Sequence, residues 1–382
     1  MRSQGRFRFA PIVVIIVVTA LTVTVAATAS RAKTSAGPGV ANAAADLVKI
    51  QAGINEWTGP NTGPKAESGK TIVFVTHDLG APVEAGIAKN LTTVAKLVGW
   101  KVKAIDGQNS ITEMSAGLSQ AMALKPDAIV ADAIPNALFP QLIKARKLGI
   151  PVICSATAPT PGVWTKVGCD VNIFQDYGKL GAALADWVIV HSNGKLQGVI
   201  LSDKTYSIVT AKTDGINNQF KKMGCTGCKV LVYTQVPFAD AAQRLPSLTT
   251  AWVQKYGTPL YLLNPSDFFS QIEIPALRSI HAKQGDVVLT GMDGNPASYA
   301  AIRGQNAYQL MDIPLPLDYL GYQLVDNINR VMHHAPISNP STPIYVVDKT
   351  NVDKNGGNLG TFTPGNGYKK HFLELWKTGA TS

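Results

Sequence analysis

The sequence contains no long run of lysine or arginine, although its 382 residues carry a formal net charge of +10. Nucleic-acid binding requires a clustered basic patch, so this even spread argues against a nucleic-acid partner. The sequence also lacks a Gly-X-Ser-X-Gly elbow and an HExxH zinc motif, and its Gly-rich segment 63–71 precedes a strand, where a phosphate loop must follow one. We therefore expect no catalytic activity, no metal and no cofactor.

The N-terminus has the pattern of an export signal. Residues 1–29 begin with Arg2, Arg6 and Arg8, continue through an uncharged apolar core, and end in small residues that suit signal peptidase. The apolar core is also close to the roughly 18 residues needed to span a membrane, so an uncleaved anchor is the alternative. Residues 30–69 are rich in Ala, Gly, Pro, Ser and Thr and are expected to form a flexible linker. We expect a periplasmic or other extracytoplasmic location.

Cysteine is scarce, with four residues in the chain and none before Cys154. Because no cysteine follows the apolar core, there is no attachment site for a lipid of the lipoprotein kind. Cysteines in an exported protein favour disulfides, and the candidate pairs are Cys154 with Cys169 and Cys225 with Cys228. A Cys-X-X-Cys can also be a redox or zinc motif, but the first would begin a helix and the second needs further ligands nearby.

From residue 70 onward, short apolar runs alternate with helical patterns. The run 71–75 precedes a helix whose apolar stripe includes Val83, Ile87 and Leu91. Each strand–helix–strand unit forces a parallel pairing with a right-handed crossover. The alternation runs twice, once on each side of residue 170, with a long helix expected over 173–190. The predicted fold class is therefore α/β, with two doubly wound parallel-sheet lobes and a ligand cleft between them.

The segment 286–295, DVVLTGMDGN, closes a buried strand on Asp293. A carboxylate at the carboxyl end of such a strand projects into the crevice above the sheet, where ligands bind in open α/β folds. The alternative is that Asp293 sits in a turn and caps the helix that starts near Pro296.

The chain resembles the periplasmic sugar-binding proteins of the ribose-binding type, which are type I periplasmic binding proteins. The segments that carry the likeness are KTIVFVTHD, KPDAIVAD, LGIPVICSA and DVVLTGMDGNPASYAAIRGQ. The likeness covers about residues 70–350 and lies more in the order of elements than in any single motif. Met292 stands where the family has an aromatic residue, and Ala156-Thr157 stand where it has Asp-Arg, which removes a charged pair from the expected pocket.

The resemblance implies a set of ligand contacts in the loops that follow the strands. They fall on His77, Asp78, Asp132, Thr157, Trp164, Asp203, Asp214, Phe238, Asn264, Asp267, Asp293 and Asp312. Carboxylates suit a hydroxyl-rich ligand because they accept charge-assisted hydrogen bonds through two oxygens. Phe238 and Trp164 are available to cover the apolar face of a sugar ring, or are ordinary core. Because the family's arginine is absent and aspartates are many, an amine or cationic ligand stays open.

The same resemblance implies the domain organisation and the role. The chain would cross between the lobes near 169–172, 312–314 and 340–343, forming a three-strand hinge. Lobe 1 would comprise 70–169 and 313–340, and lobe 2 would comprise 170–312 and 341–382. The implied function is a monomeric substrate-binding protein that delivers a sugar-like small molecule to an ABC transporter permease. The alternative is a membrane-tethered sensor that hands a ligand signal to a partner.

Overall fold

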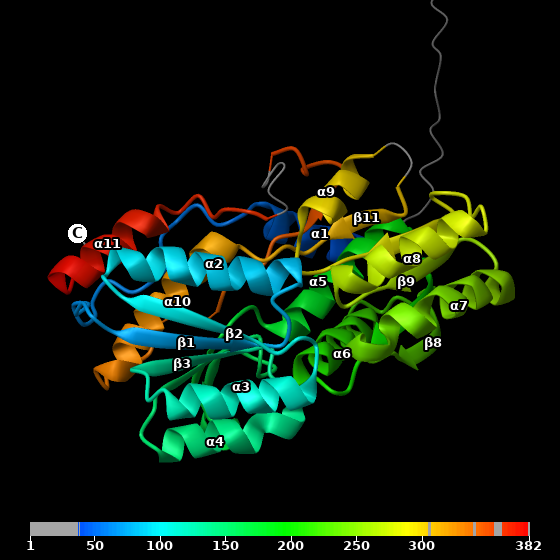
Figure 1. Ribbon diagram of the computed structural model, residues 1–382. Coiled ribbons are helices and arrows are strands. Elements are labelled where there is room, and N and C mark those ends of the chain that lie inside the picture. Colours follow the sequence, from blue (N-terminus) through cyan, green and yellow to red (C-terminus); the bar gives the residue numbers. More distant parts are fainter. Residues whose placement is uncertain (1–36, 38, 305–306, 339–340, 355–360, 381–382) are drawn as a thin grey trace, which may run out of the picture. The chain divides into compact units, whose positions relative to one another are not determined.

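The computed structural model describes residues 37, 39–304, 307–338, 341–354 and 361–380. Two six-stranded sheets organise this part of the chain into two α/β lobes (Figure 1). The predicted export signal at 1–29 lies outside the described residues. Of the helices described, none combines the length and the hydrophobicity that a bilayer span requires.

The first sheet has the strand order β2-β1-β3-β4-β6-β5, and all its pairs are parallel except β5 with β6. Alternate residues of β1 face opposite layers, so Ile72 and Phe74 pack with α2 whereas Val73 and Val75 pack with α3 and α4. Helices therefore cover both faces, as a parallel sheet requires. The elements of this lobe are β1 (Thr71–Thr76), α2 (Pro82–Leu97), β2 (Lys101–Asp106), α3 (Ile111–Ala123), β3 (Ala128–Asp132), η1 (Asn136–Leu138), α4 (Phe139–Lys147), β4 (Val152–Ser155), β5 (Gly162–Trp164), η2 (Thr165–Val167), β6 (Cys169–Ile173) and α10 (Leu317–Met332).

The second sheet has the order β12-β11-β10-β9-β7-β8, and all its pairs are parallel except β11 with β12. Its face toward α5 and α6 includes Ile200 and Val288, and its face toward α7 and α8 includes Val199 and Leu289. The predicted buried strand within 286–295 is β10, and all its residues are buried. The elements are α5 (Tyr177–His191), β7 (Gln197–Ser202), α6 (Ser207–Lys222), β8 (Lys229–Gln235), α7 (Phe238–Tyr256), β9 (Leu260–Leu263), α8 (Asp267–Ser279), β10 (Val287–Thr290), α9 (Pro296–Arg303), β11 (Gln309–Asp312) and β12 (Val347–Asp348).

Both predicted cysteine pairs are disulfides in the structure. Cys154–Cys169 joins β4 to its neighbour β6, and Cys225–Cys228 closes the turn between α6 and β8. Neither bridge involves a residue that lines the cavity between the lobes. The cysteines therefore have a structural role in each lobe.

The segment expected to be a flexible linker packs against the folded body over much of its length. Helix α1 (Val40–Gln51) places Ala43 and Leu47, one turn apart, against α5. Further along, Trp57 stacks on His371 with ring centroids 4.7 Å apart. The expectation of a tether therefore fails for these residues, because a short apolar stripe is enough to dock a helix once a partner surface exists.

The C-terminal tail contacts both lobes, whereas the sequence led us to expect lobe 2 alone. Strand β12 extends the second sheet, but α11 (Tyr368–Thr378) packs against α10 over the first sheet (Figure 1). The physical reason is an aromatic stripe at helical spacing, in which Tyr368, Phe372 and Trp376 contact Tyr322.

Gln175 connects the segments that cross between the lobes. Its buried amide donates to the carbonyl oxygens of Pro314 (3.3 Å) and Pro343 (2.7 Å), which lie in the other two crossings. Helix α5 begins at Tyr177, after the N-cap Asp176, and not at 173 as the sequence suggested. The first crossing consequently follows β6 at 174–176, whereas we expected it at 169–172. Position 340 of the expected third crossing lies outside the described residues.

We expect Gln175→Leu to lower the free energy of unfolding by about 2 kcal/mol or more, because it leaves two buried carbonyl groups without their donor. Urea unfolding of the variant and of wild type measures the difference. The exposed glutamine of α3, changed as Gln120→Leu, is the matched control and should alter stability little. Equal stability of the Gln175 and Gln120 variants would contradict a linking role for this side chain.

Candidate functional site

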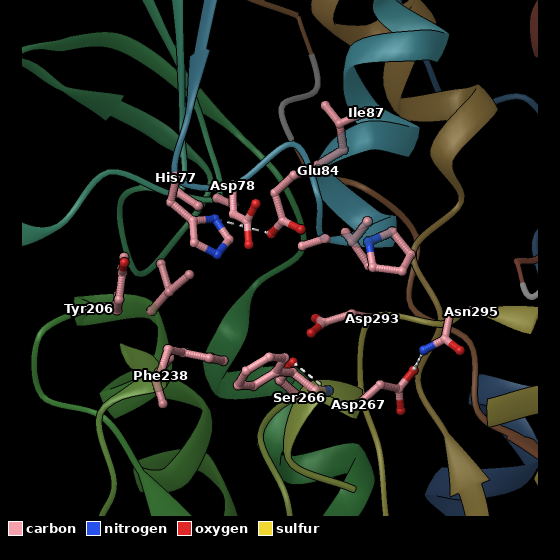
Figure 2. A pocket seen from close by; sticks show the side chains of 18 of the residues that line it. His77, Asp78, Glu84, Ile87, Tyr206, Phe238, Ser266, Asp267, Asp293 and Asn295 are labelled. Carbon is pink, nitrogen blue, oxygen red and sulfur yellow. Dashed lines mark hydrogen bonds and ion pairs between the residues drawn. The ribbon is translucent and has the colours of Figure 1, made fainter. Parts of the chain in front are cut away.

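A cavity of about 420 Å³ lies between the two lobes, at the carboxyl ends of their strands. The first lobe contributes the loop after β1, the start of α2 and the ends of β3 and β4. The second lobe contributes the starts of α5, α6, α7 and α8 and the turn after β10. Figure 2 shows the two sets facing each other, with His77, Asp78 and Glu84 across the space from Asp267, Asp293 and Asn295. This is where the topology of parallel sheets places ligands.

Asp293 is held rigidly at the cavity by its own backbone. Its N–H donates to the Ile313 carbonyl (2.9 Å) and its carbonyl accepts from the Leu315 N–H (2.9 Å), while its φ of 98° is in the left-handed region. Its Oδ1 accepts from the Lys212 ammonium at 2.9 Å. Lys212 is 4% exposed and also donates to the Pro265 carbonyl at 2.7 Å. The buried ammonium and the backbone together fix one carboxylate oxygen.

Glu84 and His77 form a second polar pair, with 3.5 Å between Glu84 Oε1 and His77 Nδ1. Burial, reinforced by the charges of Asp293 and Asp78, raises the pKa of Glu84 to about 8. Burial also lowers the pKa of His77, against the opposing pull of nearby carboxylates. Both side chains are therefore mainly neutral near pH 7. The titratable or charged groups that face Glu84 are His77, Asp78, Asp132, Tyr177, Tyr206, Lys212 and Asp293.

Asp267 is a preorganised acceptor at the floor of the cavity. Its oxygens accept from Gly294 N (3.1 Å), Asn295 Nδ2 (2.9 Å) and Gln309 Nε2 (2.8 Å). Burial raises the pKa of Asp267 to about 7 and raises that of its neighbour Asp312 well above the ordinary range. Asp312 thus keeps its proton, and Asp267 orients the turn that carries Asp293.

Aromatic rings form the other part of the cavity wall. Phe238 lies 5.8 Å from Tyr206 and 5.6 Å from Phe268, measured between ring centroids. Phe174 stacks on Tyr177 at 5.2 Å, and the Lys212 ammonium lies 5.6 Å from the Tyr177 ring centre. The cavity therefore combines carboxyl groups with aromatic faces.

The sequence-predicted site residues fall into three groups. The first group lines the cavity and consists of His77, Asp78, Phe238, Asp267 and Asp293.

A second group is buried around the cavity without lining it. Asp132 accepts from Thr76 Oγ1 inside the first sheet, and Asp203 accepts from the Phe238 N–H at 3.0 Å, which fixes the start of α7. The Thr157 carbonyl accepts from Ser207 Oγ across the lobes at 3.2 Å. Asn264 donates to Glu273 in α8, and Asp312 lies beneath Asp267. These side chains support the residues that reach the cavity.

The third group lies away from the cavity. Trp164 is in β5, where its indole N–H donates to the Thr160 carbonyl at 2.9 Å and its ring packs on the core of the first lobe. Asp214 is exposed on α6, whereas the resemblance implied a ligand contact. Opposite faces of a helix are about two residues apart, so an error of one or two positions moves a side chain from cleft to solvent.

Sequence reasoning missed Glu84, Lys212 and Tyr177, which all line the cavity. A signal was present for two of them. Glu84 shares the apolar stripe of α2 with Ile87, and Lys212 shares that of α6 with Val209 and Ile216. A charged residue on the buried face of an amphipathic helix needs a polar partner, which points to a cavity or an ion pair.

Within the described residues, no group of three or more His, Cys, Asp or Glu side chains is placed to hold a metal ion.

Comparisons with known proteins agree with this geometry. A family model described as periplasmic binding protein domain matches residues 72–333. No curated protein matches the chain. An ABC transporter solute binding protein from Agrobacterium vitis, bound with alpha-D-tagatopyranose, is 16% identical with a TM-score of 0.68, and the match covers 77% of this chain and 100% of that one.

Two further solved structures are similar. The Caulobacter myo-inositol binding protein, bound to myo-inositol, is 17% identical with a TM-score of 0.64, and 76% of this chain and 97% of that chain are covered. A periplasmic ribose ABC transporter structure from Conexibacter woesei is 16% identical with a TM-score of 0.64, covering 76% and 96% of the two chains. At these identities the likeness shows a shared fold.

The raised pKa of Glu84 predicts a pH-dependent stability of the unliganded protein. The pKa of Glu84 is about 8 in the folded state and 4.5 ordinarily, so between these pH values the folded state holds a proton that the unfolded state has lost. The stability that this proton gives is complete below pH 4.5 and is lost as the pH rises through 8. We expect the free energy of unfolding to fall less steeply with pH in Glu84→Gln, with a slope smaller by up to about 1.4 kcal/mol per pH unit.

Urea unfolding of ligand-stripped protein between pH 5 and 8.5 measures this slope. Asp132 and Asp267 titrate in the same window, so part of the decline should persist in the variant. The exposed Glu113, changed as Glu113→Gln, is the control and should keep the wild-type slope. Parallel curves for wild type and Glu84→Gln would disprove the prediction.

Proposed function

The chain belongs to the periplasmic binding protein domain family, and we propose that it captures a sugar or polyol between its lobes and delivers it to an ABC transporter permease. The observation that carries this proposal is the cavity of about 420 Å³ built from the strand ends of both lobes. Its size lies within the range of small-molecule sites. We propose that it acts as an extracytoplasmic monomer and does not turn its ligand over.

The polar groups of the cavity support a hydroxylated ligand. Asp293 offers a carboxylate oxygen, Oδ2, that no described donor uses, and Gln271 and Asn109 add amides that can donate or accept. Phe238 presents an aromatic face for the C–H side of a ring. The names of the similar structures, which mention tagatopyranose, myo-inositol and ribose, are consistent with such a ligand.

The two-lobe construction supports capture by closure. Lobe contacts at the edge of the cavity include Ser207 N donating to Asn136 Oδ1 at 3.2 Å and Asn136 N donating to the Thr205 carbonyl at 3.2 Å. A ligand that touches both lobes favours the state in which they are close, and that state presents a surface made of both lobes to a permease. The sensor alternative depends on residues 1–29, which lie outside the described part of the chain.

A thermal-shift screen tests the ligand class. A ligand at 100 times its dissociation constant should stabilise the protein by about 2.7 kcal/mol, which is readily visible as a shift in Tm. The panel comprises pentoses, hexoses, polyols and, as unrelated small molecules, amino acids. Stabilisation by amino acids and by none of the hydroxylated compounds would contradict the proposal.

We expect Asp293→Asn to weaken binding of the best hydroxylated ligand by about tenfold or more, because the lost charge-assisted acceptor is worth roughly 1.5–3 kcal/mol. Asparagine is preferable to alanine because it tolerates a left-handed φ and can still accept from Lys212. Alanine would leave the buried Lys212 ammonium without its counter-charge and lower stability strongly.

Calorimetric titration gives the affinity, and melting without ligand gives the stability. The matched control is Asp286→Asn at the opposite end of β10, where the carboxylate is 42% exposed. Unchanged affinity in Asp293→Asn would show that the carboxylate does not contact the ligand.

A further inference from the structure

The cavity wall carries more carboxyl groups than its lysine can neutralise. Asp78, Glu84, Asp267 and Asp293 line it, and among the described residues Lys212 is the only lysine or arginine that does. The Lys212 ammonium is already committed, because it donates to Asp293 at 2.9 Å and to the Pro265 carbonyl at 2.7 Å. An ammonium has three donors, so it can offer a ligand one at most.

Carboxylate oxygens remain available on both sides of the cavity. Asp78 Oδ1 accepts from the Gly80 N–H at 2.8 Å, and in the described part of the chain its Oδ2 accepts from no donor and its carboxylate pairs with no lysine or arginine. Asp293 Oδ2 is likewise unused by any described donor, since Lys212 bonds Oδ1. In Figure 2, Asp78 and Glu84 lie together across the cavity from Asp293. The space between them is bounded by acceptors from both lobes.

A fully buried group also lacks a partner at this place. Tyr177 is 0% exposed and lines the cavity, yet its hydroxyl has no hydrogen-bond partner among the described residues. Leaving a buried hydroxyl unsatisfied costs free energy, so a ligand atom is the natural partner. The rings of Phe238 and Tyr206 add faces that attract a cation.

We propose that the ligand carries a protonated amine, which binds between Asp78 and Glu84 on one lobe and Asp293 on the other. This inference rests on the proposed function and narrows it: the ligand class is a hydroxylated ring with an amino group, such as an amino sugar or an aminocyclitol. A neutral sugar would leave Asp78, which pairs with no lysine or arginine of the described residues, without a counter-charge when the lobes close over it.

Without a ligand, Glu84 is neutral because of the groups that surround it. Asp78 and Asp293 oppose its ionisation and Lys212 favours it, while His77, Asp132, Tyr177 and Tyr206 complete the groups that face it. A cation placed beside Glu84 favours the carboxylate, so binding of the amine releases a proton to solvent. A neutral ligand has no such effect.

The test compares pairs of compounds that differ by one amino group. The pairs are D-glucosamine and D-glucose, D-galactosamine and D-galactose, and scyllo-inosamine and scyllo-inositol, with choline as an amine that has no sugar ring. Protein stripped of ligand by unfolding and refolding is titrated by calorimetry at pH 6.5, where both Glu84 and the amino compounds are mainly protonated before binding. We expect at least one amino compound to bind at least tenfold more tightly than its neutral partner.

Two variants separate a charge effect from a change of shape. Asp78→Asn should reduce the preference for the amino compound to less than threefold, whereas the control Asp286→Asn should keep it. Titration in phosphate and in Tris, whose ionisation enthalpies differ, should show proton release with the amino compound in wild type. In Glu84→Gln this release should be lost.

Each outcome bears on the proposed sugar capture, on the proposed amine, or on both. Equal or tighter binding of the neutral partners overturns the amine and leaves sugar capture standing. Binding of choline without any ring compound overturns the sugar class and supports the amine. Binding by no member of the panel overturns both. If the preference for the amino compound persists in Asp78→Asn and its binding to wild type releases no proton, the amine does not bind beside Asp78 and Glu84.

Discussion

One buried ammonium group sets the chemistry of the cavity. Lys212 projects from α6 into a space that solvent barely reaches, and a buried positive charge must have partners there. The Pro265 carbonyl and the Asp293 carboxylate provide them. Because Asp293 is also locked by backbone bonds to the 313–315 crossing, the pair joins α6, the turn after β10 and the hinge. The site and the connection between the lobes therefore depend on the same contact.

The remaining carboxyl groups adjust to that contact through their protons. Glu84 and Asp312 stay protonated near neutrality because burial and neighbouring charges disfavour their ionised forms. Asp267 accepts from three donors, and its pKa of about 7 leaves it partly charged near neutrality. The protonation of these groups limits the net negative charge of the cavity, and a bound cation would reverse part of that effect. Proton release and recognition of a cationic ligand are in this sense one equilibrium.

Much of the fold and part of the site could be predicted from the sequence. Short β-branched runs alternating with amphipathic helices are local signals, and parallel pairing then brings strand ends such as Asp78 and Asp293 to one crevice. Glu84 and Lys212 were not predicted, because helix residues reach the cavity only through tertiary packing. Helix α11 was not predicted, because its stripe is short and its partner surface comes from a distant segment. The hinge residue Gln175 was absorbed into a predicted helix, since an N-cap at Asp176 is hard to place from pattern alone.

The side chain of Gln175 has a mechanical consequence for the whole molecule. Three unconnected strands between two bodies can each twist separately, so the bodies could rock, slide or shear in several directions. When the amide of Gln175 bonds the three strands to one another, they bend together about one axis. The two lobes then move relative to each other mainly by rotation about that axis. Under the proposed function, a ligand that contacts both lobes beside this axis would set the angle between them, and the outer edges of the lobes would move farthest.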